Sequence, residues 1–273
     1  KIHKGTKMKA RVLVSRTAGT NCDYEMVHAF ELCGASVDLV HINRLLNKEV
    51  YLMNYNILAI PGGFSYGDDI SAGRILANEL RLKLGNDLKK FIQDGKLMIG
   101  ICNGFQVLVK AGILPGETDH ATGEEKAIQQ ATLMTNDSGK FEDRWTFLRV
   151  SGRSAWTENM EGVVYFPVAH GEGKFVCKNK NILSKIQNNH QVIFRYSTQD
   201  GRKAGYPQNP NGSQDDIAGI ADPTGHILGL MPHPERHYFF TQHPFWTRLP
   251  KKSRYGDGVK IFQNGVNYIK KHF

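Results

Sequence analysis

The sequence predicts an α/β fold: a doubly wound, mostly parallel sheet with helices on both faces, plus additional antiparallel strands. Two observations support this prediction. Up to Gly112, short apolar runs alternate with longer amphipathic segments, which is the pattern of a parallel sheet covered by helices. Beyond Gly112 the apolar runs are shorter, β-rich and closely spaced, as in antiparallel strands or an added sheet.

The first part of the chain contains four apolar runs that we expect to be strands and three segments that we expect to be helices. The first helix is closed by Gly34, and the long second helix is interrupted near Gly85. The strands are expected at 10–15, 35–42, 55–63 and 97–101, and the helices at 23–34, 73–94 and 103–112.

The second part contains five short β-rich runs, a hairpin and a C-terminal helix. The hairpin is indicated by Pro223, Thr224 and Gly225, which are residues typical of a turn. The five runs lie at 131–136, 144–150, 162–168, 174–177 and 191–196, the hairpin at 217–231 and the helix at 258–273.

We expect residues 9–273 to form a single domain, because no internal repeat, low-complexity segment or linker divides the sequence. The longest polar stretch, 206–216, is loop-like. Residues 1–8 are expected to be an N-terminal tail or a remnant of cloning.

The composition is that of an ordinary globular protein, with 273 residues, 40% hydrophobic and 22% charged. No apolar run approaches the roughly 20 residues of a membrane span, and no apolar signal segment precedes the first strand, so no membrane partner is expected. The four cysteines form no C-x-x-C pair, which disfavours a zinc site or a disulfide framework and predicts a cytoplasmic location. The formal charge of +9 fits a solvated basic surface or a binding surface for nucleic acid or an acidic protein.

A G-x-C-x-G turn links the strand at 97–101 to the helix that follows it. Gly100, Cys102 and Gly104 have the form of a nucleophile elbow with sulfur in place of oxygen. Such an elbow exposes its central side chain at the carboxyl edge of the sheet, where a helix N-terminus stabilises a thiolate. We therefore expect Cys102 to be a nucleophile, and the alternative is a packed structural cysteine.

Two loops at this edge of the sheet carry candidate donors for an oxyanion. The backbone N–H of Asn103 would point at an oxyanion formed next to Cys102. The loop PGGFSYGDD, residues 61–69, follows the third strand and could present the N–H of Gly63. A glycine-rich loop can also bind phosphate, but neither the G-x-G-x-x-G nor the G-x-x-x-x-G-K-[ST] pattern is present.

The segment LMPHPERH, residues 230–237, contains the best candidate for a base that activates this cysteine. Each proline disfavours the helical conformation for the residue before it, so we expect His233 to be extended. In an extended segment residues i and i+2 project from one face, which would bring Glu235 beside His233. The carboxylate would then orient the imidazole, whose other nitrogen would face Cys102.

Other interpretations of these polar residues remain open. His233, Glu235, His237 and His243 could bind a metal, although the prolines exclude the helical H-E-x-x-H arrangement, and we predict no metal. Cys22 precedes a helix and could have a lowered pKa, but packing at the helix start is favoured. His170 and Glu172 could contact a substrate or form loop hydrogen bonds. The segment 241–252 could be a docking surface or a cover for the sheet edge.

Together these residues resemble the class I glutamine amidotransferases, which combine a G-x-C-x-G-x-Q elbow with a late His-x-Glu pair. Here the elbow includes Gln106 in addition to the residues named above. Within that family, the segments PGGFSYGDD, GICNGFQVL, PVAHGEGKF, NPNGS and GLMPHPERH are similar to the glutaminase subunits of phosphoribosylformylglycinamidine synthase. The resemblance runs from about residue 10 to the C-terminus and implies a flavodoxin-like sheet.

The resemblance also implies the chemistry. Cys102 would attack the side-chain amide of L-glutamine, releasing ammonia and leaving a γ-glutamyl thioester. His233 would protonate the ammonia and then activate water, and Glu235 would orient it. Gly63 and Asn103 would bind the oxyanion; Gly62, Gln106 and, more loosely, His170 would contact the substrate.

The ammonia would pass to a separate ATP-dependent synthase subunit, with or without a small accessory subunit, which makes formylglycinamidine ribonucleotide. ATP and magnesium would bind to that partner, and no cofactor is expected on this chain. Two alternatives stay open: the glutaminase of another synthase or a cysteine hydrolase on the same fold, and a non-catalytic basic module that binds nucleic acid.

Overall fold

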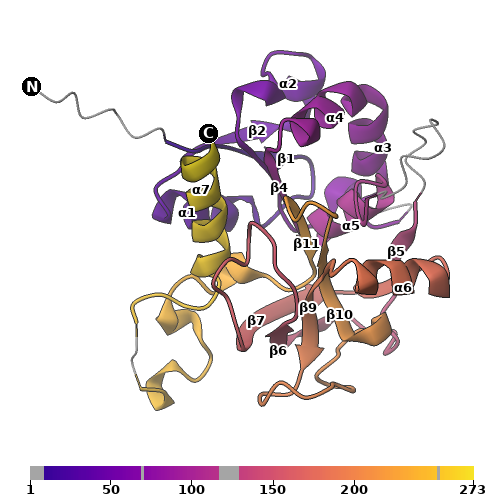
Figure 1. Ribbon diagram of the computed structural model, residues 1–273, viewed down its shortest axis with the longest axis vertical. Coiled ribbons are helices and arrows are strands. Elements are labelled where there is room, and N and C mark those ends of the chain that lie inside the picture. The colour runs from indigo at the N-terminus through magenta and orange to yellow at the C-terminus, as the bar shows by residue number, and fades with distance from the viewer. Residues whose placement is uncertain (1–8, 69–70, 117–128, 251–252) are drawn as a thin grey trace, which may run out of the picture.

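The computed structural model describes residues 9–68, 71–116, 129–250 and 253–273 (Figure 1). A nine-stranded sheet in the strand order β2-β1-β3-β4-β11-β10-β9-β6-β7 runs through the middle of the molecule. The α/β class predicted from the alternation of apolar runs is confirmed.

Five strands form the parallel part of the sheet. They are β1 (Arg11–Arg16), β2 (Ser36–His41), β3 (Ile57–Ile60), β4 (Leu97–Ile101) and β11 (Ile227–Leu230). Every residue of β3, β4 and β11 is buried, as expected for strands that are covered on both faces.

The remaining strands are antiparallel, and they form both an extension of the main sheet and a separate small sheet. The extension consists of β10 (Ile217–Ala221), β9 (Val192–Ser197), β6 (Glu142–Val150) and β7 (Val163–His170). The small sheet pairs β5 (Ala131–Met134) with β8 (Lys174–Cys177). Both arrangements considered for this β-rich part therefore occur.

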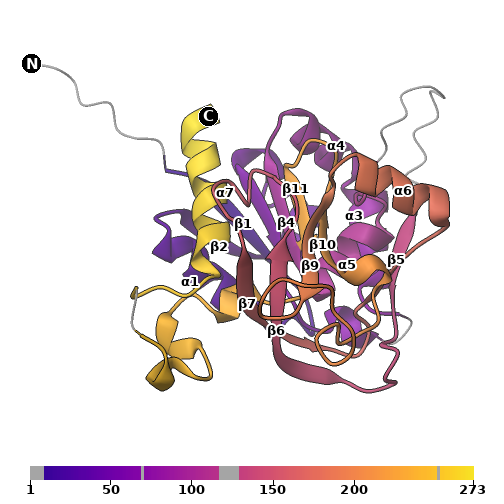
Figure 2. The same ribbon diagram turned by 60° about the horizontal axis from the view of Figure 1, so that its bottom comes forward.

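Helices cover both faces of the parallel strands, as Figure 2 shows. One face carries α1 (Asp23–Leu32) and α7 (Val259–His272); the other carries α3 (Arg74–Lys83), α4 (Gly85–Gln93) and α5 (Asn103–Lys110). The interruption expected near Gly85 is confirmed, because α3 ends at Lys83 and α4 begins at Gly85.

Among the α-helices of the described ranges, two were not predicted: α2 (Ile42–Leu46) and α6 (Lys180–Asn188). The side chain of Asn179 caps α6 by accepting a hydrogen bond from the backbone N–H of Ile182 at 3.0 Å. This N-cap was the overlooked sequence signal. By contrast, α2 spans five residues, too short for periodicity to reveal.

The largest buried side chain, Trp156, packs on the face that carries α1 and α7. Its ring contacts Phe30 edge to face, with 6.4 Å between ring centroids, and Phe30 in turn contacts Phe262 at 5.0 Å. A Cβ atom added to Gly265 would lie 2.5 Å from the Trp156 ring. The glycine therefore lets α7 approach the indole closely.

The sheet curls so strongly that its edge strand β7 returns to the end of β4. Four strand-to-strand steps separate β11 from β7, which would be roughly 19 Å in a flat sheet. Yet the backbone N–H of His233, just after β11, donates to Pro167 of β7 at 2.8 Å. The twist of the antiparallel extension thus brings β7 to the carboxyl edge of the parallel strands.

A very close approach of α5 to β3 fixes the strand-to-helix turn after β4. A Cβ atom added to Gly104 would lie 1.9 Å from the carbonyl oxygen of Ile60, and one added to Gly100 would lie 2.5 Å from the carbonyl oxygen of Gly104. Since these contacts involve backbone atoms, no rotamer change could relieve them.

We predict that Gly104→Ala lowers the free energy of unfolding by about 3 kcal/mol, because the methyl group forces α5 away from β3. Gly85→Ala is the matched control, since nothing lies within 4 Å of its added Cβ. The control should stay within about 1 kcal/mol of the wild type, on the stabilising side. Urea unfolding measures both; equal stabilities of the two variants would contradict the close packing.

Candidate active site

Cys102 lies in a strained turn between β4 and α5. Its φ of 53° and ψ of −107° are unusual for a residue with a side chain. Its backbone N–H donates to Leu230 of β11 at 2.8 Å, and its thiol lies 3.7 Å from the carbonyl oxygen of Ala169 on β7. Three strands therefore hold this cysteine at the N-terminus of α5, with 5% of its surface exposed.

His233 and Glu235 are hydrogen-bonded to each other beneath this turn. The distance between His233 Nδ1 and Glu235 Oε1 is 2.6 Å, and both residues are buried. The other ring nitrogen, Nε2, has no hydrogen-bond partner among the described residues. This arrangement leaves Nε2 available to exchange a proton with a reacting group.

The backbone conformation that brings His233 and Glu235 together differs from the expected one. Pro234–Arg236 forms a 3₁₀ turn with proline in its first position, and His233 precedes the turn with φ −105° and ψ 87°. The prediction of an extended segment was therefore wrong beyond His233. Proline is well suited to the first turn of a helix, and this tight turn brings the carboxylate back to the imidazole.

The charges around His233 favour its protonated form. Burial by itself would lower the pKa of His233, but the Glu235 carboxylate and the sulfur of Cys102 raise it well above the usual value. An imidazolium at neutral pH can donate a proton to a departing amine.

The loop after β3 lies directly against the histidine and the cysteine. A Cβ atom added to Gly62 would lie 2.8 Å from His233 Cε1 and 3.4 Å from Cys102 Cβ. Gly63 has a φ of 143° and forms an isolated β-bridge with Thr20. Glycine is therefore required at both positions of this loop, for space at the first and for conformation at the second.

Asn103 begins α5, so its backbone lies beside Cys102 at the helix N-terminus. Its side-chain oxygen accepts hydrogen bonds from the backbone N–H and the hydroxyl of Ser65, the latter being very short. These bonds join the start of α5 to the loop that contains Gly63. The two expected oxyanion donors are thus on neighbouring, mutually bound segments.

Gln106 is buried one turn into α5, and both ends of its amide are bound. Its oxygen accepts from Asn103 Nδ2 at 2.9 Å, and its nitrogen donates to the carbonyl oxygen of Glu172 at 2.5 Å. The residue therefore connects the elbow to the loop that follows His170.

His170 ends β7 and is buried and neutral. Burial and the nearby charge of His233 lower its pKa to about 3. Its Nε2 lies 3.4 Å from Asn211 Nδ2, and its Nδ1 has no hydrogen-bond partner among the described residues. The amide of Asn211 also donates to the buried hydroxyl of Tyr196 at 3.1 Å.

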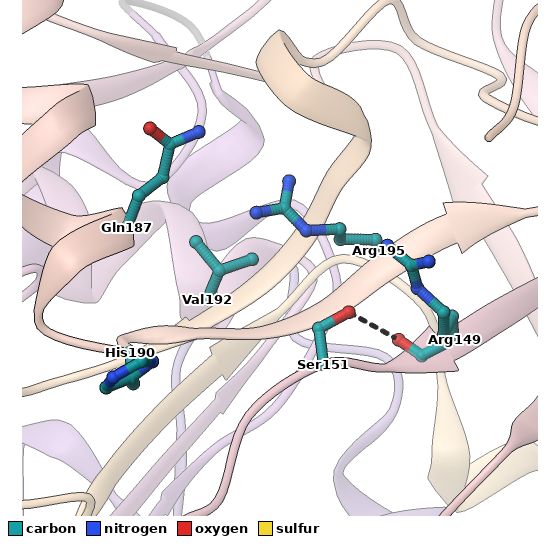
Figure 3. Close-up of a pocket in the computed structure, with 6 residues that line it drawn as sticks. All are labelled: Arg149, Ser151, Gln187, His190, Val192 and Arg195. Atoms are coloured by element: carbon teal, nitrogen blue, oxygen red, sulfur yellow. Dashed lines mark hydrogen bonds between the residues drawn. The ribbon is translucent and has the colours of Figure 1, made fainter.

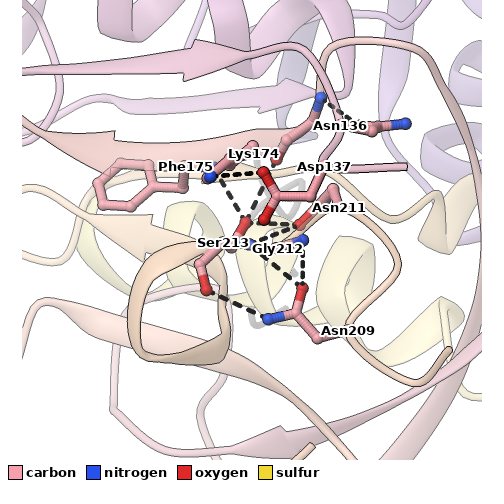
Figure 4. A network of polar contacts seen from close by, with 9 residues as sticks. Asn136, Asp137, Lys174, Phe175, Asn209, Asn211, Gly212 and Ser213 are labelled. Carbon is pink, nitrogen blue, oxygen red and sulfur yellow. Dashed lines mark hydrogen bonds and ion pairs between the residues drawn. The ribbon is translucent and has the colours of Figure 1, made fainter. Parts of the chain in front are cut away.

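Asn211 belongs to a network of polar contacts between loops (Figure 4). Asn209 accepts from the backbone N–H of Gly212 at 3.0 Å, and Ser213 Oγ accepts from the N–H of Phe175 at 2.9 Å. Asn136 Nδ2 donates to the carbonyl oxygen of His170 at 2.8 Å. The loop-like stretch 206–216 is thus a structured support for the site.

The histidines proposed as alternative metal ligands do not gather around one point. His237 Nδ1 lies 2.8 Å from the carbonyl oxygen of Tyr165, and His237 and His243 contact each other through their rings. Within the described ranges, the group that could hold a metal consists instead of Cys22, His233 and Glu235. Its histidine and carboxylate are already hydrogen-bonded, and the guanidinium of Arg236 donates to Cys22 Sγ at 3.1 Å, which opposes a cation.

A cavity of about 280 Å³ lies away from these residues (Figure 3). Glu142 at the start of β6 pairs with His170, whereas Arg149 and Ser151, which line the cavity, lie at the opposite end of that strand. Arg195 and Gln187, also in the lining, both bind Asp215. The cavity is therefore separate from the elbow.

The family model of the CobB/CobQ-like glutamine amidotransferase domain matches residues 9–269. The chain belongs to this family. Phosphoribosylformylglycinamidine synthase subunit PurQ of Dehalococcoides mccartyi is 49% identical over 265 residues, which cover 96% of this chain and 98% of that protein. The subunit of the same name from Treponema denticola is 41% identical over 272 residues, or 96% and 100% of the two chains.

Two solved structures share the fold of this chain. A chain in the structure of PurLQS from Thermotoga maritima superposes with a TM-score of 0.71 at 30% identity, covering 96% of this chain and 100% of that one. A glutamine amidotransferase from the same organism gives a TM-score of 0.50 at 14% identity, covering 97% and 96% of the two chains, which shows the fold alone. None of the helices in the described ranges has the length and hydropathy needed to cross a bilayer.

Several residues of the site were not found by sequence reasoning. Arg236 directly follows Glu235 and contacts Cys22, while Asn211 contacts both His170 and Tyr196. The asparagine-rich stretch NPNGS was a visible signal, because Asn and Ser side chains bind backbone groups in turns. Cys22, for which helix-start packing was favoured, is buried with a pKa that burial raises.

We predict a pH-dependent stability from the His233–Glu235 pair. Because the folded-state pKa of His233 is raised, its contribution is full below pH 6.5 and is lost as the pH rises through the raised value. Above pH 6.5 the free energy of unfolding should fall in the wild type relative to Glu235→Gln, by up to about 1.4 kcal/mol per pH unit.

Urea unfolding at intervals across roughly pH 6 to 9 measures this difference. Glu158→Gln, which neutralises an exposed carboxylate, is the matched control and should follow the wild type. If the free energy of unfolding changed with pH in the same way in the wild type and in Glu235→Gln, the coupling between this carboxylate and His233 would be contradicted.

Proposed function

We propose that this protein is the glutaminase subunit of a phosphoribosylformylglycinamidine synthase. It hydrolyses L-glutamine to glutamate and ammonia and supplies the ammonia to a synthase subunit that makes formylglycinamidine ribonucleotide in de novo purine biosynthesis. The observation that carries the proposal is the strained Cys102 elbow beside a buried His233–Glu235 pair, in a chain that matches the named subunits over nearly their full length.

The reaction begins when Cys102, whose thiol proton passes to His233, attacks the side-chain carbonyl carbon of glutamine through Sγ. The carbonyl electrons move onto oxygen, and the backbone N–H groups of Gly63 and Asn103 stabilise this oxyanion. When the carbonyl re-forms, the carbon–nitrogen bond breaks, and the proton on His233 passes to the nitrogen, which leaves as ammonia. The product on the enzyme is a γ-glutamyl thioester.

Hydrolysis of the thioester completes the cycle. Now neutral, His233 takes a proton from water, whose oxygen attacks the thioester carbon, and the carbon–sulfur bond breaks to release glutamate. Glu235 keeps the imidazole oriented through the bond to Nδ1 and favours the charged form in both steps.

Substrate contacts follow from the surroundings of the elbow. Gly62 leaves the space beside Cys102 and His233 that a side chain would fill. Gln106 and His170 complete the substrate-binding group. Gln106 positions the loop at Glu172 through a hydrogen bond to its carbonyl oxygen, and His170 contributes its buried imidazole.

The partner is an ATP-binding synthase subunit, joined in some assemblies by a small accessory subunit. ATP and magnesium belong to the synthase, and this chain binds no cofactor or metal. The similarity to a chain of the PurLQS structure supports a multi-subunit assembly. In the described part of the segment 241–252, residues 241–250, Phe245, Trp246 and Leu249 are exposed, whereas His243 packs on Tyr165 of the edge strand.

We also propose that residues 9–273 form one amidotransferase domain and that the protein is cytoplasmic. The domain is supported by the family match at 9–269 and by one hydrophobic core that runs from Ala10 to Ile269. The location is supported by the cysteine spacing. Residues 1–8, expected to be a tail or a remnant of cloning, lie outside the described residues.

The test of this function separates glutamine use from ammonia use. In the complex with its synthase, Cys102→Ala should reduce glutamine-dependent synthesis by at least about 10³-fold, because the nucleophile is lost. Ammonia-dependent synthesis should stay within about two-fold, since the synthase active site is untouched. The measurement is the rate of formylglycinamidine ribonucleotide formation from either nitrogen source.

Cys177→Ala is the control, because this buried cysteine of β8 takes no part in the site. It should leave both rates near those of the wild type. Survival of glutamine-dependent synthesis in Cys102→Ala would overturn the proposal, and loss of both rates in that variant would show a structural defect rather than a chemical one.

A further inference from the structure

The segment between β1 and α1 braces the loop that contains Gly62 and Gly63. The carbonyl oxygen of Gly62 accepts hydrogen bonds from the backbone N–H groups of Asn21 and Cys22, at 3.3 and 3.2 Å. On the other side, the N–H of Phe64 donates to Gly19 at 2.8 Å. The main chain around Cys22 therefore sets the position of the proposed oxyanion loop.

The side chain of Cys22 contacts the other half of the site. Its Sγ accepts a hydrogen bond from Arg236 Nη2 at 3.1 Å and lies 3.8 Å from His233 Nδ1. It also donates to Asn21 Oδ1 at 3.0 Å. Since burial raises the pKa of the Cys22 thiol, the group is a neutral thiol with both its donor and its acceptor capacity used.

Arg236 extends this connection to the first turn of α1. Its Nη2 also lies 3.7 Å from the carboxylate of Glu25, and it directly follows Glu235 in the 3₁₀ turn. A shift of Arg236 would move the residue that orients His233.

The side chains of His233, Cys22 and Cys102 meet at one point beside Gly62. The Cβ position of this glycine is 2.8 Å from His233 Cε1, 3.1 Å from Cys22 Sγ and 3.4 Å from Cys102 Cβ. With 1% of its surface exposed, Cys22 has no freedom to move without moving its neighbours.

We propose that Cys22 is a positioning residue for the glutaminase reaction, which couples the oxyanion loop to the His233–Glu235 pair. Its backbone holds Gly62, and its thiol binds Arg236 and packs against the imidazole, so that the loop and the histidine keep their positions relative to Cys102. The inference rests on the proposed function, and it assigns to Cys22 no bond to the substrate.

The test compares the two cysteines that flank α1. Cys22 lies at the N-terminus of α1 and Cys33 at its C-terminus, where Cys33 Sγ contacts the carbonyl oxygen of Val259 at 3.8 Å, outside the site. In the complex with its synthase, Cys22→Ala should lower kcat for glutamine hydrolysis by about ten-fold, as expected when a residue that orients a reacting group is lost. The KM for glutamine should change by less than about two-fold, and Cys33→Ala should leave both constants near the wild type.

Cys22→Ser distinguishes hydrogen bonding from packing. The hydroxyl keeps one donor and one acceptor, so this variant should recover most of the lost kcat. Thermal unfolding of all variants provides the structural reference: each variant should be fully folded at the assay temperature, so that differences in kcat report on the site.

The outcomes are separable from those of the proposed function. An inactive wild type would overturn the glutaminase assignment itself. An active wild type with equal kcat for Cys22→Ala and Cys33→Ala would overturn the positioning role alone. A kcat for Cys22→Ser no higher than that for Cys22→Ala would also overturn it, because a role exerted through Arg236 and His233 requires a polar atom at this position.

Discussion

The contact between Gly104 and the carbonyl oxygen of Ile60 is the constraint on which the rest of the site depends. With 1.9 Å between that oxygen and an added Cβ, α5 can lie against β3 only because no side chain intervenes. The approach forces the chain to turn sharply after β4, and the turn places Cys102 at φ 53° with its backbone N–H bound to β11. The strain is maintained because β4, β11 and β7 all hold this residue.

The curl of the sheet encloses the site that the turn after β4 places at the sheet edge. Parallel strands alone would present Cys102, Gly62 and His233 at a common edge, open on one side. The return of β7 supplies the carbonyl of Ala169 beside the thiol and a backbone anchor for His233 at Pro167. Burial of this kind lowers the local dielectric, so that the Glu235 carboxylate acts strongly on His233 and keeps it protonated.

Sequence reasoning predicted the features that local patterns encode. The elbow, the glycine loop, the histidine–glutamate contact and most strands follow from spacing and turn chemistry within a few residues. What it did not predict depends on distant contacts: the curl that joins β7 to β4, the support of His170 by Asn211, and the contact of Cys22 with Arg236 across 214 residues of sequence. The predicted extended conformation of Pro234–Arg236 was wrong. Proline disfavours a helical conformation for the residue before it, but it favours a turn that begins at its own position.

The most direct measurement of the central claim, that Cys102 is the nucleophile for glutamine, is peptide mapping by mass spectrometry after treatment with a diazo-ketone analogue of glutamine. The experiment is done with and without the synthase, and free glutamine is added as a competitor. We predict one adduct, on Cys102, which glutamine suppresses; an adduct that forms only with the synthase present would agree equally well. An adduct on Cys22 in place of Cys102, or no cysteine adduct under either condition, would contradict the claim.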